Sequence, residues 1–263
     1  HQIGAEALGF YGRAYQMMIM PAALFGKIID KVLFPAMSTI QDQVDRLRTV
    51  YKRGITLIAL VVLPFSVVMY VLSPEIVLLL LGPKWLEIVI PFKIMSLGIL
   101  FQTSSVMSNS LTRATGVVYE RAWRQAVYAA SVLGGVWIGH FWGLSGVAFG
   151  LLVASFINFI LMAYLSLMQI SMLWKDFLMA HLQPMLLTII VWSEVYVTAM
   201  ILRSFAVPAV VILVIPILLL IVSTVFMIRY APNLILGKDG TWILHTLLNY
   251  IPPKYNPLNR VGV

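Results

Sequence analysis

The stretch GFYGRAYQMMIMPAALFGKIIDKVLFPAMSTI, residues 9–40, is long enough to cross a bilayer as one helix, yet it carries four charged residues. An α-helix turns about 100° per residue, so Arg13, Lys27 and Lys31 fall on one narrow stripe, with Asp30 beside it. The opposite side is apolar. Because charges inside hydrocarbon cost several kcal/mol unless they face protein or water, this stripe should face a helix bundle or an aqueous cavity.

The composition of the chain indicates an integral membrane protein. Hydrophobic residues make up 61% of its 263 residues and charged residues only 11%, whereas soluble domains average about 25% charged residues. There is no cysteine, so disulfide and thiol chemistry are excluded. The net charge of +8 does not indicate nucleic-acid binding, because the basic residues are spread between apolar segments.

The apolar segments predict an all-α membrane fold with about seven transmembrane helices in one lobe, residues 1–228, and a cytoplasmic tail, residues 229–263. An apolar segment at 74–87 is too short to cross the bilayer and predicts an interfacial half-helix. Residues 175–183 are predicted to form a short connection. The expected spans are 9–40, 54–74, 88–112, 125–142, 146–168, 184–202 and 204–228.

Lysine and arginine counts predict the orientation of these spans. The connections after the first, third and fifth spans and the tail hold 12 of them, while the other connections hold 2. The positive-inside rule therefore predicts a cytoplasmic C-terminus. The chain begins without Met and without a signal peptide, so we expect that it lacks the N-terminal part of a larger protein.

Signatures of soluble enzymes are missing from the sequence. It has no Walker loop, HExxH, GxSxG or dinucleotide fingerprint. The four histidines are scattered over different connections and ends. We therefore expect a transporter rather than an enzyme, with no metal site and no cofactor.

Charged residues inside the predicted spans are the candidate functional groups. Arg13, Lys27 and Lys31 could form a cationic surface for a phosphate, partly neutralised by Asp30. Alternatively, Arg13 extends to the interface, and Lys27 pairs with Asp30 to join helices. Lys93 lies about six residues inside its span, where it could face a cavity or reach the headgroups.

Polar groups in the other spans leave two interpretations open. Glu194 could be a proton or cation site, as could Asp30, or Glu194 could be a protonated side chain hydrogen-bonded to a neighbouring helix. The polar residues within 102–110 favour packing between helices over substrate contact. Gly134 and Gly135 allow close helix approach.

Several phrases of the sequence resemble a known family. ALGFYGRAYQ (7–16) and VLFPAMSTIQDQ (32–43) form the most specific pair, with support from LSPEIVLLLLGPKW, SNSLTRATG and HFWGLSGVAFG. They resemble the oligosaccharide flippases of bacterial polysaccharide biosynthesis, of the Wzx type, in the multidrug/oligosaccharidyl-lipid/polysaccharide exporter superfamily. The likeness covers residues 4–169 well and the later helices by pattern.

This resemblance implies about fourteen helices in two lobes around a central cavity that opens to each face in turn. The chain would correspond to the second lobe, from the eighth helix on, and would need the N-terminal lobe as its partner. The implied substrate is an undecaprenyl-diphosphate-linked sugar repeat unit, moved across the inner membrane. Arg13, Lys27, Lys31 and Lys93 are the candidates to bind it.

Other function classes fit the sequence less well. A multidrug or cation antiporter of the same superfamily would need acidic groups facing the cavity, and the spans offer mainly Asp30 and Glu194. A membrane-embedded enzyme would need clustered carboxylates or a large soluble loop. An oligomeric anchor would not need so many charges inside its spans. Neighbouring genes for glycosyltransferases and a polymerase would favour the flippase.

Overall fold

The computed structural model describes residues 12, 16, 23, 26, 27, 31 and 33–230. Its described residues form helices and connections, with no strand among them. Of the first predicted span, residues 33–38 are helical. Arg13 and Asp30 lie outside the described residues, as does most of the predicted tail.

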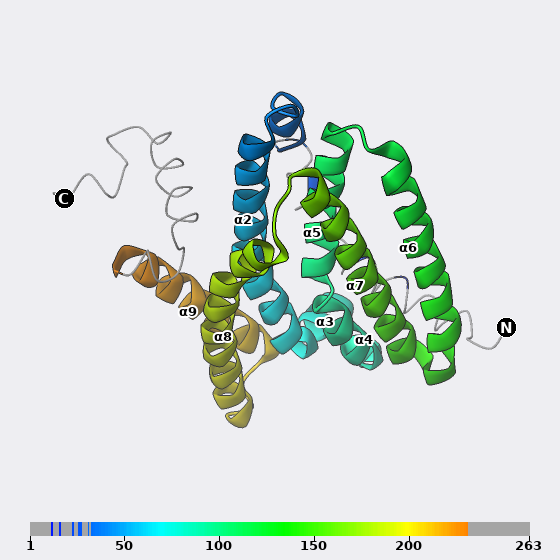
Figure 1. Ribbon diagram of the computed structural model, residues 1–263. Coiled ribbons are helices and arrows are strands. Elements are labelled where there is room, and N and C mark those ends of the chain that lie inside the picture. The colour runs from blue at the N-terminus through cyan, green and yellow to red at the C-terminus, as the bar shows by residue number, and fades with distance from the viewer. Residues whose placement is uncertain are drawn as a thin grey trace.

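The described helices follow one another with short connections (Figure 1). Five of them, α2 and α6 to α9, have 22 to 31 residues, which is about 33 to 46 Å and enough to cross a hydrocarbon core of about 30 Å. The elements are α2 (Val44–Val71), α3 (Ser73–Leu81), η1 (Pro83–Ile88), α4 (Val89–Ser96), α5 (Ile99–Ala114), α6 (Val118–Gly139), η2 (His140–Trp142), α7 (Gly143–Gln169), α8 (Trp174–Ser204) and α9 (Ala209–Tyr230).

By length and hydropathy, four helical stretches of the described residues could cross a membrane, or five if the bent pair Pro83–Ser96 and Ile99–Ala114 is one span. One of the four is Val118–Gln169, with 52 residues. As a single helix it would be about 78 Å long. Instead, η2 and Gly143, with φ of 67°, reverse the chain, so that α6 and α7 form a hairpin of two spans.

With this hairpin counted as two spans and the bent pair as one, the described part of the chain has six candidate spans: α2, the bent pair, α6, α7, α8 and α9. The all-α membrane fold predicted from the sequence is confirmed. The third predicted span is bent by 44° between α4 and α5. The short apolar segment predicted at 74–87 forms α3 and η1, and the 9 residues of α3 span only about 13 Å.

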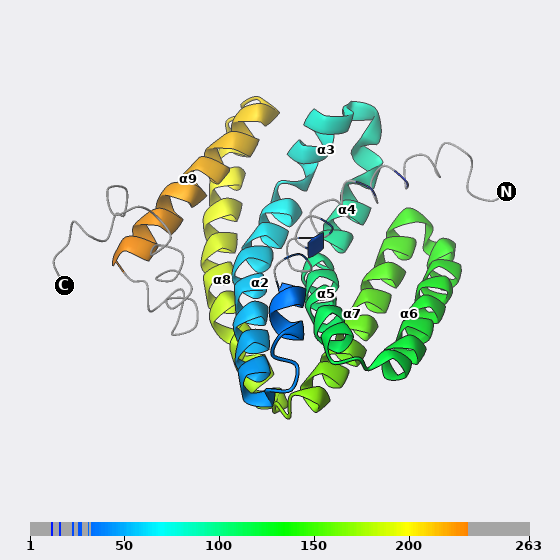
Figure 2. The same ribbon diagram turned by 90° about the horizontal axis from the view of Figure 1, so that it is seen from above.

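The spans lie side by side in the order α9, α8, α2, α5, α7, α6, with α3 and α4 across one end (Figure 2). The connections before α2, between α5 and α6, and between α7 and α8 lie at the opposite end (Figure 1). Two buried clusters form the core, one around Tyr51 and Phe177 and the other around Phe92 and Val195.

The predicted connection at 175–183 is wrong, because these residues begin α8. The exposed Lys175 suggested a loop, yet Phe177, Ala180 and Pro184 are buried at helical spacing. A helix with this period buries one face even when its first turn is charged. The connection between α7 and α8 is therefore only residues 170–173.

Candidate functional site

Lys27 and Lys31 lie one helical turn apart, and both are exposed. Gly26 beside them is buried, and a Cβ added there would lie 3.4 Å from Cγ2 of Val106. Since Val106 lies midway along α5, Gly26 brings its helix against the middle of α5. Lys27, the next residue, is exposed on the lobe beside this contact.

Further cations lie toward one end of α5. The Arg113 guanidinium lies 5.0 Å from the ring centroid of Phe34, and its Nη2 donates to Oγ of Ser110 at 3.3 Å. Arg121 Nε on α6 donates to Oδ1 of Asn109 at 3.1 Å. Sequence reasoning assigned both arginines to a basic connection, so it missed that they belong to helices.

Lys93 lies on α4 and is half-buried. Its Nζ is 5.7 Å from the centroid of the Tyr70 ring on α2, within the range of a cation–π interaction. Lys93 therefore contacts α2 close to the bend between α4 and α5.

Glu194 is half-buried near the middle of α8, and its Oε2 accepts a hydrogen bond of 2.8 Å from Oγ of Ser223 on α9. The carboxyl group therefore faces a neighbouring helix. Among the candidate ion-coupling residues, Glu194 is the one that the structure describes.

The polar residues of α5 join three helices. Oγ of Ser108 and the hydroxyl of Tyr51 on α2 are 2.8 Å apart. Oγ of Ser166 on α7 donates to the Ser108 carbonyl at 3.4 Å. Both contacts are buried, in agreement with the predicted packing role of the polar residues within 102–110.

An ion pair that sequence reasoning missed joins the end of α8 to α3. Nε and Nη2 of Arg203 donate to the two carboxylate oxygens of Glu75, each at 2.8 Å. Nη2 also donates to the Val71 carbonyl at 2.9 Å. The Glu75 side chain is 7% exposed and that of Arg203 36%. This pairing has no local sequence signal, because 128 residues separate the partners.

His, Asp and Glu side chains of the described residues form no group that could hold a metal ion. The site is therefore a set of cations at different depths of a helical lobe, together with pairs that join its helices. Such an arrangement can bind an anion without covalent chemistry.

Comparisons with known proteins identify what this chain is similar to. Residues 1–90 match a protein family described as "Polysaccharide biosynthesis protein". The chain is 26% identical over 163 residues to the lipopolysaccharide biosynthesis protein WzxC of Escherichia coli, a match that covers 60% of this chain and 32% of WzxC. It is 25% identical over 190 residues to the teichuronic acid biosynthesis protein TuaB of Bacillus subtilis, covering 71% of this chain and 39% of TuaB.

Among solved structures, the fold matches the lipid II flippase MurJ in an inward closed conformation, with a TM-score of 0.68 and 17% identity. The match covers 87% of this chain and 48% of MurJ. The chain thus spans about a third of the curated relatives' length and about half of MurJ. The predicted resemblance is confirmed: in sequence the chain is similar to bacterial polysaccharide biosynthesis proteins, including one of the Wzx type, and in fold it is similar to the lipid II flippase MurJ.

Proposed function

We propose that this chain is one lobe of a flippase that moves lipid-linked oligosaccharides across the bacterial inner membrane by alternating access. The cargo is an undecaprenyl-diphosphate-linked repeat unit of a surface polysaccharide. The relatives' names, which refer to lipopolysaccharide and teichuronic acid biosynthesis, support this class of cargo. The lysine and arginine counts support a cytoplasmic C-terminus.

The observation that carries the proposal is the position of Lys27. Gly26 fixes the helix against the middle of α5, and Lys27 and Lys31 are exposed one turn apart. A cation within a membrane-spanning segment requires protein or water around it. A diphosphate that leaves the headgroup layer requires paired cations. A hydrated cavity beside these lysines meets both requirements.

A single lobe leaves such a cavity open on one side. The match to about half of MurJ supports a second lobe of similar size as the partner that closes it. Arg13, Lys31 and Lys93 are further candidates for the anion, and Lys93 would serve the end of the cavity near α4. Transport accordingly requires both lobes.

Replacing Lys27 in the full-length protein tests this function. Lys27→Ala should reduce surface polysaccharide without lowering the amount of protein in the membrane, and Lys27→Arg should retain most of it. Lys175→Ala removes an exposed lysine at the start of α8 and is the matched control. Normal polysaccharide with Lys27→Ala would contradict the proposed role of the lysine.

A further inference from the structure

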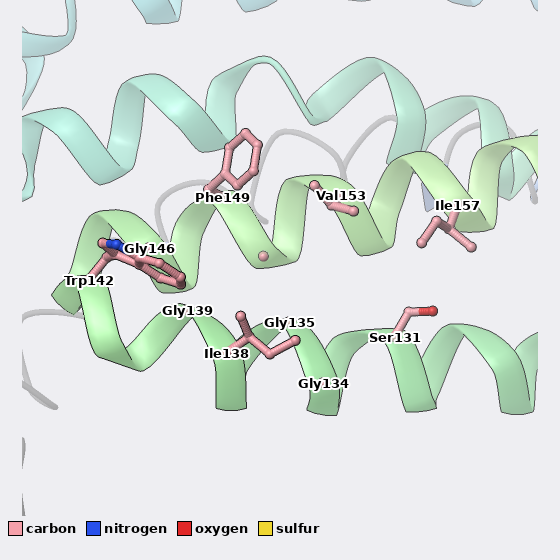
Figure 3. Close-up of a pocket in the computed structure, with 11 residues that line it drawn as sticks. Ser131, Gly134, Gly135, Ile138, Gly139, Trp142, Gly146, Phe149, Val153 and Ile157 are labelled. Carbon is pink, nitrogen blue, oxygen red and sulfur yellow. The ribbon is translucent and has the colours of Figure 1, made fainter.

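A groove of about 690 Å³ lies between α6 and α7 (Figure 3). It forms beside a close contact of the two helices, because a Cβ added to Gly135 would lie only 2.7 Å from the Gly150 carbonyl oxygen. Large side chains on both helices, including Ile138 and Phe149, form its walls. Gly134 also lines it, and a Cβ added at Gly134 meets nothing within 4 Å. The space above Gly134 is therefore open.

The lining of this groove is apolar. None of its 11 residues is charged. The hydroxyl of Ser131 donates to the Val127 carbonyl of its own helix at 2.8 Å, so its proton is not available to a phosphate or a sugar oxygen. The remaining lining is carbon surface, with the indole of Trp142 at the turn between the helices. A phosphate or sugar would lose its hydrogen bonds here, whereas a hydrocarbon chain would not.

The length of the groove corresponds to one leaflet of a bilayer. It runs from Gly146 to Ile157 along α7, which is 12 residues or about 16 Å of helix. That is half of a hydrocarbon core of about 30 Å. Exposed aromatic residues lie at the turn, with Trp142, and at the far end of α6, with Tyr119 and Trp123. Aromatic residues at both ends are typical of a helix that crosses between the two interfaces.

From this geometry we infer that the groove binds one acyl chain of a bilayer phospholipid. A stable protein–protein interface takes about 20–30 residues a side, whereas the groove offers 11. A partner helix would also extend through both leaflets, beyond the groove. An acyl chain matches the length of one leaflet, and its headgroup stays at the interface beside Trp142. The inference does not depend on the proposed transport.

Photo-cross-linking in vesicles tests the inference. The full-length protein is reconstituted in phosphatidylethanolamine vesicles that contain a trace of the same lipid with a diazirine on one acyl chain. Mass spectrometry then compares labelling of Phe149 and Val153 in the groove with labelling of Val222 and Val225, which are exposed on α9. We expect the groove to be labelled several-fold more than α9.

Filling the groove should remove this preference. Gly134→Phe is expected to lower labelling of the groove to the level of α9. If Gly134→Phe does not fold, the smaller Gly134→Leu takes its place with the same expected result. Leu133→Phe places the same benzyl side chain at an exposed neighbour outside the groove and should leave labelling unchanged. Equal labelling of groove and α9 in the unaltered protein would overturn the inference. So would disulfide-linked dimers of Val153→Cys that the unaltered protein does not form, since a second copy would then occupy the groove.

Discussion

The Glu75–Arg203 pair supports a quantitative prediction about how α8 is held. Arg203→Met removes both hydrogen bonds to the carboxylate and the one to the Val71 carbonyl. It leaves Glu75, whose side chain is 7% exposed, without its cation. Removing one partner of a buried pair costs about 3–5 kcal/mol. Because Arg203 is 36% exposed, we expect the lower end, about 3 kcal/mol, or a factor of roughly 10² in the unfolding equilibrium.

A double-mutant cycle separates the pair from its surroundings. Glu75→Met alone should cost less than Arg203→Met, because the remaining guanidinium can still donate to the Val71 carbonyl and reach water. The variant with both changes should be more stable than Arg203→Met alone, because no uncompensated charge remains buried. Free energies of unfolding in mixed detergent micelles, followed by circular dichroism, give the four values.

Glu87→Ala, at an exposed acidic residue on η1, is the control and should change the free energy of unfolding by less than about 0.5 kcal/mol. The reasoning is refuted if the costs of Arg203→Met and Glu75→Met simply add in the double variant. It is also refuted if Arg203→Met costs no more than an exposed pair, about 0–1 kcal/mol.

Two further predictions concern contacts between spans. Gly135→Leu should lower the thermal stability and the yield of the protein, because even the Cβ atom of a side chain at this position meets the Gly150 backbone. Gly134→Ala should be tolerated, because a Cβ atom there enters open space. Size-exclusion chromatography after heating measures the folded fraction of both variants. Glu194→Gln should leave surface polysaccharide near normal, because an amide oxygen can still accept from Ser223; loss of polysaccharide at normal protein level would instead favour a coupling role for Glu194.

The helices could be predicted from the sequence because a bilayer demands about 20 consecutive apolar residues for each span. Their ends were less predictable. The first turns of α8 were not predicted, because Lys175 is charged and a membrane span is expected to be apolar. The burial of these turns depends on where Phe177 packs. The bend between α4 and α5 was missed because residues 94–101, which contain it, have no proline and no charge. That another helix could approach closely at Gly135 was predictable from the small size of glycine. That this helix makes the contact with Gly150 could be seen only from the geometry of the hairpin.

The candidate site was predictable only in part, for a similar reason. A charge in a span is visible in the sequence, whereas its partner is not. Glu194 gave no sign that Ser223 would be its partner 29 residues later. Arg203 was assigned to the connection between two predicted spans and Glu75 to the predicted interfacial half-helix, although they form a two-pronged ion pair. Lys27 could be proposed from the sequence because its stripe is local to one helix.

The polar groups of the lobe fall into two kinds, and the contrast supports the proposed cavity. Tyr51 and Glu194 hydrogen-bond to groups on neighbouring helices, so their role in holding the lobe together accounts for their presence in the spans. Lys27 and Lys31 are exposed, although Gly26 packs their helix against the middle of α5. Cations that face hydrocarbon are costly, so selection for stability alone would favour apolar residues at such positions. The proposed wet, anion-binding cavity accounts for their presence.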